Sequence, residues 1–148
     1  MIFSFAIPFL LGQNQLVTGI VVNAALFVSS TFPGYSFLPI VILPSLAVLG
    51  RGLIFGPQTS FLVYFFPFVW LGNLVLIFIF RGVQGRWGNW WGVSIASLSK
   101  YLLLFSLANL FFHFNLVPRL FLQTMGFNQL ATALLGGIVS LWIIKRLK

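Results

Sequence analysis

Long apolar segments constrain this chain more than any other feature. The segment "SFLVYFFPFVWLGNLVLIFIF" (60–80) contains no charged side chain, and similar segments recur along the 148 residues. About 20 consecutive apolar residues are enough for an α-helix to cross the hydrocarbon core of a bilayer. Within lipid, each backbone N–H and C=O group needs a partner in the protein, which a helix provides along its own length. The sequence therefore predicts an all-α integral membrane protein.

The composition supports this fold class. Hydrophobic residues make up 60% of the chain and charged residues only 5%, whereas a soluble domain carries roughly 25% charged residues. We therefore expect the lipid bilayer to surround most of the surface. The charged residues are eight Lys and Arg, with no Asp or Glu at all. A basic excess often marks nucleic-acid binding, but these cations are too scattered to form a binding stripe, so we expect no nucleic-acid partner.

Missing residue types exclude several classes of site. Acid–base pairs of the glycosidase and aspartic-protease types need carboxylates. The chain has no Cys and one His, so it lacks thiol nucleophiles and thiolate metal sites, and His113 alone cannot make a zinc site. No Walker-type glycine loop is present, so ATP-driven work would need a partner. We expect a protein that is not an enzyme, with no metal and no cofactor.

The apolar segments predict one compact bundle of about six transmembrane helices. The first is short and interrupted by Pro8, and the last could begin as early as Leu120. Brief turns "PGYS" (33–36) and "GPQT" (56–59) and a glycine-rich loop (81–91) separate the later segments. No linker divides the chain, so a single domain over residues 1–148 is expected. The expected spans are 1–11, 15–32, 37–55, 60–80, 90–113 and 130–148.

Basic residues predict the orientation of the bundle. Arg81 and Arg86 lie in one loop, and Lys145, Arg146 and Lys148 lie at the C-terminus. Positive residues mark the cytoplasmic side, and two spans separate these groups, so both are expected in the cytoplasm. Counting back along the spans also places the N-terminus there. The segments expected outside are 12–15, 51–59 and 114–129.

Lys100 interrupts the apolar stretch "ASLSKYLLLF" (96–105). It follows Trp90 by ten residues, which places it about 15 Å deep, near the midplane. A lysine there costs about 2.5–3.5 kcal/mol on insertion scales. Three interpretations remain open: the side chain snorkels to the headgroups, backbone carbonyls or aromatic rings hold its ammonium, or it lines a polar pocket. In the last case an anion must come from outside the chain.

Other polar residues could share such a pocket. Arg51 in "LGRGL" is flanked by glycines that allow close approach, so it is either an interfacial anchor or an anion contact. Asparagines within the membrane spans either form hydrogen bonds between helices or contact a ligand. The candidate substrate-binding residues are Lys100, Arg51, Asn14, Asn23, Asn73 and Asn109.

Small residues recur along two of the spans. Thr132, Gly136 and Ser140 follow one another at every fourth position, and Ala25 and Ser29 do likewise. Such smooth stripes allow close helix contact, either inside the bundle or with another subunit.

From Gln15 onward the chain resembles a known family. The strings that carry the resemblance are "QLVTGIVVNAALFVSS", "LPSLAVLGRGLIFGP" and "FFPFVWLGNLVLIFIFRG". They are similar to the substrate-binding S components of energy-coupling factor (ECF) transporters, which capture vitamins and related micronutrients. The resemblance implies six helices, both termini in the cytoplasm, an outward-facing substrate site, and a transmembrane coupling subunit with two ATPases in trans. The chain is shorter than most members, and its first helix lacks their alanine-spaced docking motif.

These features together predict a multi-pass protein of the plasma or inner membrane that binds a small, anionic, vitamin-like solute. Two alternatives belong to other classes. One is a structural or assembly subunit without a small-molecule site, in which Lys100 could be replaced by Met or Leu with no loss of stability. The other is a small anion channel or exporter, in which Lys100 rings a pore.

Overall fold

The computed structural model describes residues 15–35, 37–55 and 59–147, with the backbone alone at 15, 48–55, 59–63 and 147. All regular structure in these ranges is helical, which confirms the predicted all-α class. The expected first span (1–11) lies outside the described ranges, so the total of six spans stays a prediction. The helices are α2 (Gln15–Ser29), α3 (Leu38–Phe55), α4 (Thr59–Trp87), α5 (Asn89–His113), α6 (Arg119–Met125) and α7 (Phe127–Leu147).

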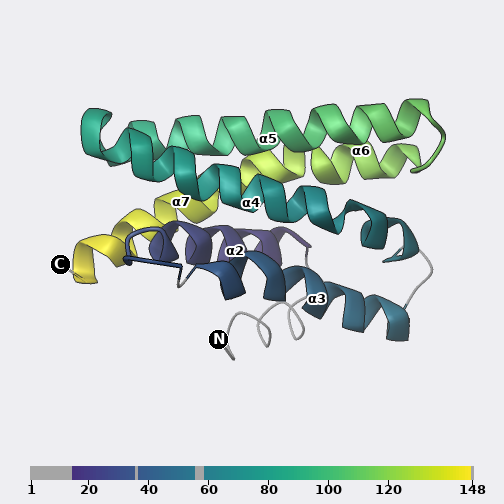
Figure 1. The fold of residues 1–148 in the computed structure, drawn as a ribbon, viewed down its shortest axis with the longest axis horizontal. Helices are drawn as coiled ribbons and strands as arrows, with labels where there is room; N and C mark the ends of the chain where they lie inside the picture. Colours follow the sequence, from purple (N-terminus) through teal and green to yellow (C-terminus); the bar gives the residue numbers. More distant parts are fainter. Residues whose placement is uncertain (1–14, 36, 56–58, 148) are drawn as a thin grey trace.

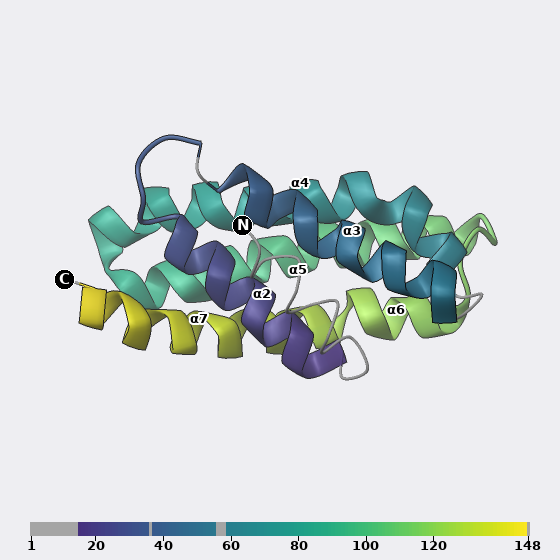
Figure 2. The same cartoon turned by 90° about the horizontal axis from the view of Figure 1, so that it is seen from below.

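The helices lie along one common long axis (Figure 1). Helix α4 pairs with α5, α2 pairs with α7, and α5 also packs on α6 and α7. Seen from below, α2 crosses obliquely over α7 and α3 lies over α4 (Figure 2). Among the described helices α3 contacts only α2 and α4, so it forms the edge of the bundle.

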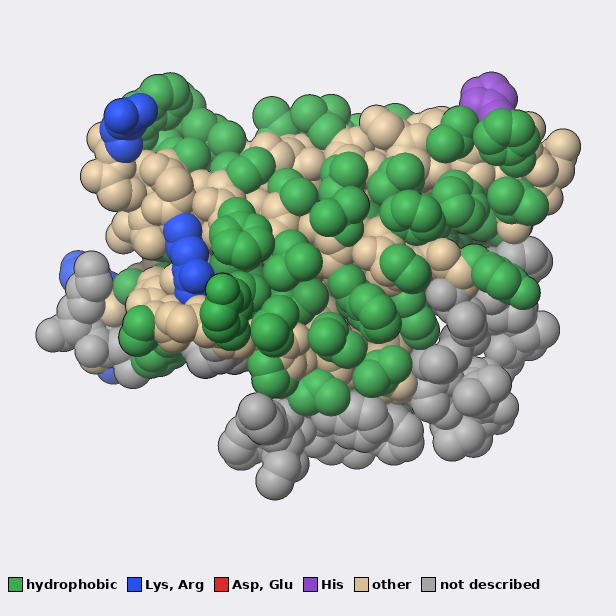
Figure 3. Space-filling view, in the orientation of Figure 1, with side chains coloured by type: hydrophobic (Ala, Val, Ile, Leu, Met, Phe, Trp, Pro, Cys, Tyr) green, Lys and Arg blue, Asp and Glu red, His purple; other side chains and the backbone are tan. Residues whose placement is uncertain are grey.

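The two ends of the bundle differ in charge. The α2–α3 connection, the α4–α5 turn and the end of α7 meet at one end, on the left of Figure 1. We call it the basic end, because Arg81, Arg86, Lys145 and Arg146 lie there. The other end, which carries the α5–α6 connection and the exposed His113 (Figure 3), is called the His113 end.

Three helical stretches are long and apolar enough to cross a membrane. They are Tyr64–Trp87, Asn89–His113 and Arg119–Arg146. Many of the side chains that these helices turn outward are apolar, among them Leu71, Phe78, Leu98, Leu102 and Leu110. Hydrophobic side chains cover much of the face drawn in Figure 3. An apolar surface of this extent suits lipid better than water.

The predicted glycine-rich loop at 81–91 is wrong. Helix α4 continues to Trp87 and α5 begins at Asn89, so Gly88 alone separates them. Its φ of 89° lies in a region that glycine enters without strain. Gly82 and Gly85 stay helical because a glycine weakens a helix without forbidding it.

Part of the outer loop predicted over 114–129 is helical, and the last helical stretch begins at Arg119, in agreement with the earlier start near Leu120 that the sequence left open. Helix α6 occupies Arg119–Met125 and α7 begins at Phe127. The break falls at Gly126, where an added Cβ would lie 2.6 Å from the Leu122 carbonyl oxygen. Helix α6 buries Phe121, whose ring meets that of Phe65 edge-on at 4.9 Å between centroids. A short apolar helix folded back onto the bundle therefore replaces part of the expected loop.

The small-residue stripe of α7 packs inside the bundle. A Cβ added at Gly136 would lie 2.7 Å from the Ile20 carbonyl oxygen and 2.8 Å from the Ala24 nitrogen, both on α2. Thr132 and Ser140 of the same stripe are buried. The internal alternative is confirmed here, and this stripe is not a surface for a second subunit.

Arg81 fixes the α2–α3 connection at the basic end. Its Nε donates to the Ser30 carbonyl oxygen at 2.7 Å, and its Nη2 donates to the Phe32 carbonyl oxygen at 2.8 Å. The guanidinium also lies 4.9 Å from the centre of the Phe37 ring. The arginine thus satisfies carbonyl groups that the end of α2 leaves without helical partners.

Candidate functional site

Lys100 lies in the middle of α5 and points into the bundle. It follows Asn89 by 11 residues and precedes His113 by 13, and its side chain is only 3% exposed. Its Nζ donates to Asn23 Oδ1 at 2.7 Å and to Asn73 Oδ1 at 2.8 Å. The snorkelling interpretation is therefore wrong. Among the described residues, the groups that hold the ammonium are side-chain amide oxygens, with no backbone carbonyl or aromatic ring beside them.

The sequence of α5 explains why Lys100 faces inward. The buried positions of this helix recur at spacings of three and four, which places them on one face. Most of these residues are small, so α4 and α7 can approach closely and enclose the lysine stem. The buried residues of α5 are Gly92, Val93, Ala96, Ser97, Lys100, Leu104 and Ala108.

The two asparagine amides are oriented by their own nitrogens. Asn23 Nδ2 donates to the Gly19 carbonyl oxygen at 2.9 Å and to Thr132 Oγ1 at 3.2 Å. Asn73 Nδ2 donates to the Val41 carbonyl oxygen at 3.1 Å. Because both nitrogens are engaged elsewhere, both oxygens face the ammonium.

One polar network therefore joins five helices. It takes Asn23 from α2, the Val41 carbonyl from α3, Asn73 from α4, Lys100 from α5 and Thr132 from α7. It lies between two apolar clusters: Ala96, one turn before Lys100, belongs to the first, and Leu104, one turn after it, belongs to the second. Such hydrogen bonds are strengthened by apolar surroundings, because no water competes for the donors.

In its ammonium form, Lys100 gives the network a positive charge that no described side chain neutralises. The 148 residues include no Asp or Glu, so none of them has an acidic side chain. A lysine ammonium has three N–H donors, and the described side chains engage two of them. This donor set repels a metal ion and attracts an anion.

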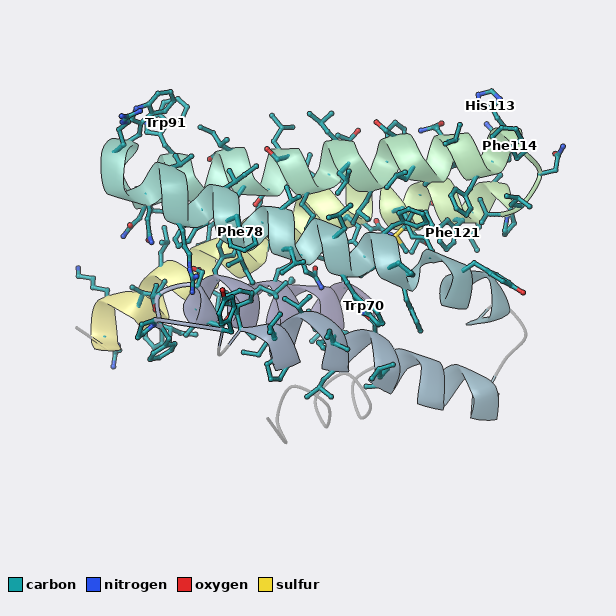
Figure 4. The ribbon with its side chains drawn as sticks, in the orientation of Figure 1. Trp70, Phe78, Trp91, His113, Phe114 and Phe121 are labelled. Carbon is teal, nitrogen blue, oxygen red and sulfur yellow. The ribbon has the colours of Figure 1, made fainter. Side chains whose placement is uncertain are left out.

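Three further buried polar atoms lack a hydrogen-bond partner within the described ranges. They are Thr18 Oγ1, Trp70 Nε1 and Ser97 Oγ. Trp70 precedes Asn73 by three residues, so both lie on one side of α4, about 4.5 Å apart along the axis. Figure 4 shows Trp70 between α4 and α3. Ser97 precedes Lys100 by the same interval, toward the basic end.

The structure separates one other predicted residue, Asn109, from this network, and it does not test Asn14 or the side chain of Arg51. Asn109 is half-buried, lies about 14 Å further along α5 than Lys100, and donates to the Phe105 carbonyl oxygen of its own helix at 2.8 Å. Asn14 lies outside the described ranges, and so does the side chain of Arg51, whose backbone belongs to α3. The structure brings together Lys100, Asn23 and Asn73.

Sequence reasoning missed the other members of the site. Thr132 was assigned to the small-residue stripe alone, although it also accepts the hydrogen bond that orients Asn23. Trp70 could have been found from its three-residue spacing to Asn73, which places both on one helix face. The Val41 carbonyl has no sequence signal, because a backbone group becomes an acceptor only through tertiary packing.

Comparison with known proteins adds no relative: no protein-family model, no curated protein and no solved structure matches this chain.

Proposed function

We propose that this protein is a multi-pass protein of the plasma or inner membrane that captures a small anionic solute at Lys100. In this proposal it is the substrate-binding subunit of an ECF-type uptake transporter for a vitamin-like micronutrient. The observation that carries the proposal is the buried ammonium, held by the oxygens of Asn23 and Asn73 without any carboxylate. The transmembrane coupling subunit and the two ATPases follow from the sequence resemblance alone.

The energetics of a buried charge favour a binding role. Burying a cation carries a desolvation penalty of several kcal/mol, and neutral hydrogen-bond acceptors offset part of it. A purely structural network could use a neutral donor at position 100 and avoid this penalty. A carboxylate or similar anion that reached the third N–H of Lys100 would supply the missing charge. Ligand binding should therefore stabilise the folded protein.

Four of the other cations support the proposed topology, and Arg119, at the start of α6, lies at the opposite end. Arg81, Arg86, Lys145 and Arg146 lie at the basic end, which we place in the cytoplasm on the positive-inside rule. Trp87, Trp90 and Trp91 are exposed around the α4–α5 turn there, as expected for an aromatic belt at a membrane interface. Both termini lie in the cytoplasm in this proposal, and the His113 end faces outward.

The proposal can be tested by thermal-shift titration of the purified protein in detergent with benzoate, isonicotinate and succinate. Lys100→Gln keeps N–H donors for the two asparagine oxygens but removes the charge, and Lys100→Met removes both. We expect at least one probe to raise the Tm of the parent, and both variants to bind it at least tenfold more weakly. Lys145→Met, at the exposed basic end, is the matched control and should respond like the parent. Equal responses in all four proteins would contradict the proposal.

A structural role is the second candidate, because the network links one group from each of five helices. The variant Lys100→Met with Asn23→Leu and Asn73→Leu replaces the network by apolar side chains, which is often neutral or stabilising. If the protein is only a structural or assembly subunit, this triple variant should fold and keep its cellular function. If it binds a solute, the variant should fold but lose that function.

A further inference from the structure

Trp70 has a hydrogen-bond donor that no described residue accepts. Its Nε1 is buried and has no partner in the described part of the chain. The indole stacks on the buried Phe66 ring, with 6.4 Å between centroids and 20° between planes. A buried tryptophan N–H normally finds an acceptor, and leaving one unsatisfied is unfavourable. The position of Trp70 between α4 and α3 (Figure 4) therefore suggests an acceptor supplied by another molecule.

Thr18 presents a second buried polar atom without a described partner, displaced toward the same end of the bundle as Trp70. Its side chain is buried and its Oγ1 lacks a partner among the described residues. Helices α2 and α4 run in the same direction (Figure 1). Thr18 precedes Asn23 by five residues, which displaces it about 7.5 Å along α2 toward the His113 end. Trp70 precedes Asn73 by three residues, which displaces it about 4.5 Å along α4 in the same direction.

Helix α3 reaches the network through the Val41 carbonyl. Of the described helices it touches only α2 and α4. The side-chain hydrogen bond that ties it to the network is the one from Asn73 Nδ2 to the Val41 carbonyl oxygen. Movement of α3 away from α4 would therefore uncover the indole of Trp70, which lies between these two helices, without disturbing the pairing of α4 with α5.

We propose that Trp70 and Thr18 complete the Lys100 site, and that its ligand is a carboxylate with a second hydrogen-bond acceptor about one helical turn from the carboxylate group. The carboxylate accepts from Lys100, and the second acceptor takes the indole N–H of Trp70. This inference rests on the proposed function, because it assumes an anion at Lys100. It adds a specificity determinant: the second acceptor distinguishes ligands that share the same charge.

The test compares two probes of similar shape, benzoate and isonicotinate, which differ in one ring acceptor. Trp70→Phe keeps an aromatic ring but removes the N–H. Thr18→Val removes the hydroxyl at nearly constant volume. Trp90→Phe, at the exposed α4–α5 turn, is the matched control. Dissociation constants are measured by isothermal titration in detergent. We expect the parent and Trp90→Phe to bind isonicotinate at least tenfold more tightly than benzoate. In Trp70→Phe this preference should fall below twofold while benzoate binding is kept, and Thr18→Val should weaken it in part.

A second readout needs no ligand. If the Trp70 N–H is unsatisfied in the empty protein, Trp70→Phe should leave the ligand-free Tm unchanged or raise it. Any of three results would overturn the inference. The parent could show no preference for isonicotinate over benzoate, or Trp70→Phe could keep the parent's preference. The third is a ligand-free Tm that is lower in Trp70→Phe than in the parent. If Lys100→Gln loses both probes while Trp70→Phe keeps the parent's preference, the proposed function survives and this inference fails. If Lys100→Gln binds both probes like the parent, both fail.

Discussion

At the scale of single residues, Asn73 engages both ends of its amide. Its oxygen accepts from Lys100 and its nitrogen donates to the Val41 carbonyl oxygen. Removing this amide would leave the ammonium with a single described acceptor. It would also free a carbonyl oxygen on α3.

Asn73→Leu should therefore destabilise the protein by roughly 3 kcal/mol, because it leaves a buried charge with too few hydrogen bonds. When Lys100→Met is added, the double variant should be more stable than the sum of the two single changes predicts, by at least about 1 kcal/mol. Thermal or SDS unfolding in detergent measures all four proteins of this cycle. If the two single changes in the free energy of unfolding add up to that of the double variant within about 0.5 kcal/mol, Lys100 and Asn73 are not coupled, which contradicts the network.

The sequence predicted part of the site at this scale. The helical rise placed Lys100 near the midplane, and the structure puts it at the middle of α5. Asn23 and Asn73 were candidates by residue type and depth, and both contact Lys100. The same criteria also selected Asn109, which bonds within its own helix. Residue type and depth cannot separate these asparagines, because the rotation of each helix about its axis decides which side chains meet.

At the scale of elements, the contact between α2 and α7 depends on glycine. Gly136→Ala should destabilise the protein by about 1–3 kcal/mol, because the new methyl group would clash with backbone atoms of Ile20 and Ala24 that cannot move aside. Gly82→Ala in α4 is the matched control: nothing lies within 4 Å of its added Cβ. Alanine there should be neutral or stabilising by up to about 1 kcal/mol.

Thermal unfolding of the two glycine variants in one detergent gives this comparison. If Gly136→Ala is as stable as Gly82→Ala, the close approach of α2 and α7 is wrong.

Sequence reasoning located the helices better than their ends. The apolar segments predicted α2 to α5 within a few residues, apart from the longer C-terminal end of α4. Glycines and polar residues predicted loops at 81–91 and 114–129, where the structure has helix apart from Gly88, residues 114–118 and Gly126. Glycine and polar side chains lower helix propensity only slightly, and tertiary contacts outweigh that preference: buried Phe121 holds α6 against the bundle.

At the scale of the whole molecule, the charge asymmetry predicts the orientation in the membrane. The chain has no cysteine, so single cysteines report their location without background. Tyr35→Cys and Lys145→Cys lie at the basic end, and Phe114→Cys lies beside His113 (Figure 4). A membrane-impermeant maleimide added to intact cells should label Phe114→Cys and leave the other two unlabelled until the cells are opened. The reverse pattern would contradict the proposed topology.

Whether the lysine-centred network holds an anion is the central question for the whole protein. Native mass spectrometry of the protein extracted in mild detergent measures this directly, with parent and Lys100→Gln prepared in parallel from the same cells. The account predicts that the parent retains a small anionic molecule, visible as one defined mass increment that collisional activation removes, and that Lys100→Gln does not retain it. A parent without any such increment, or an increment that persists unchanged in Lys100→Gln, would contradict it.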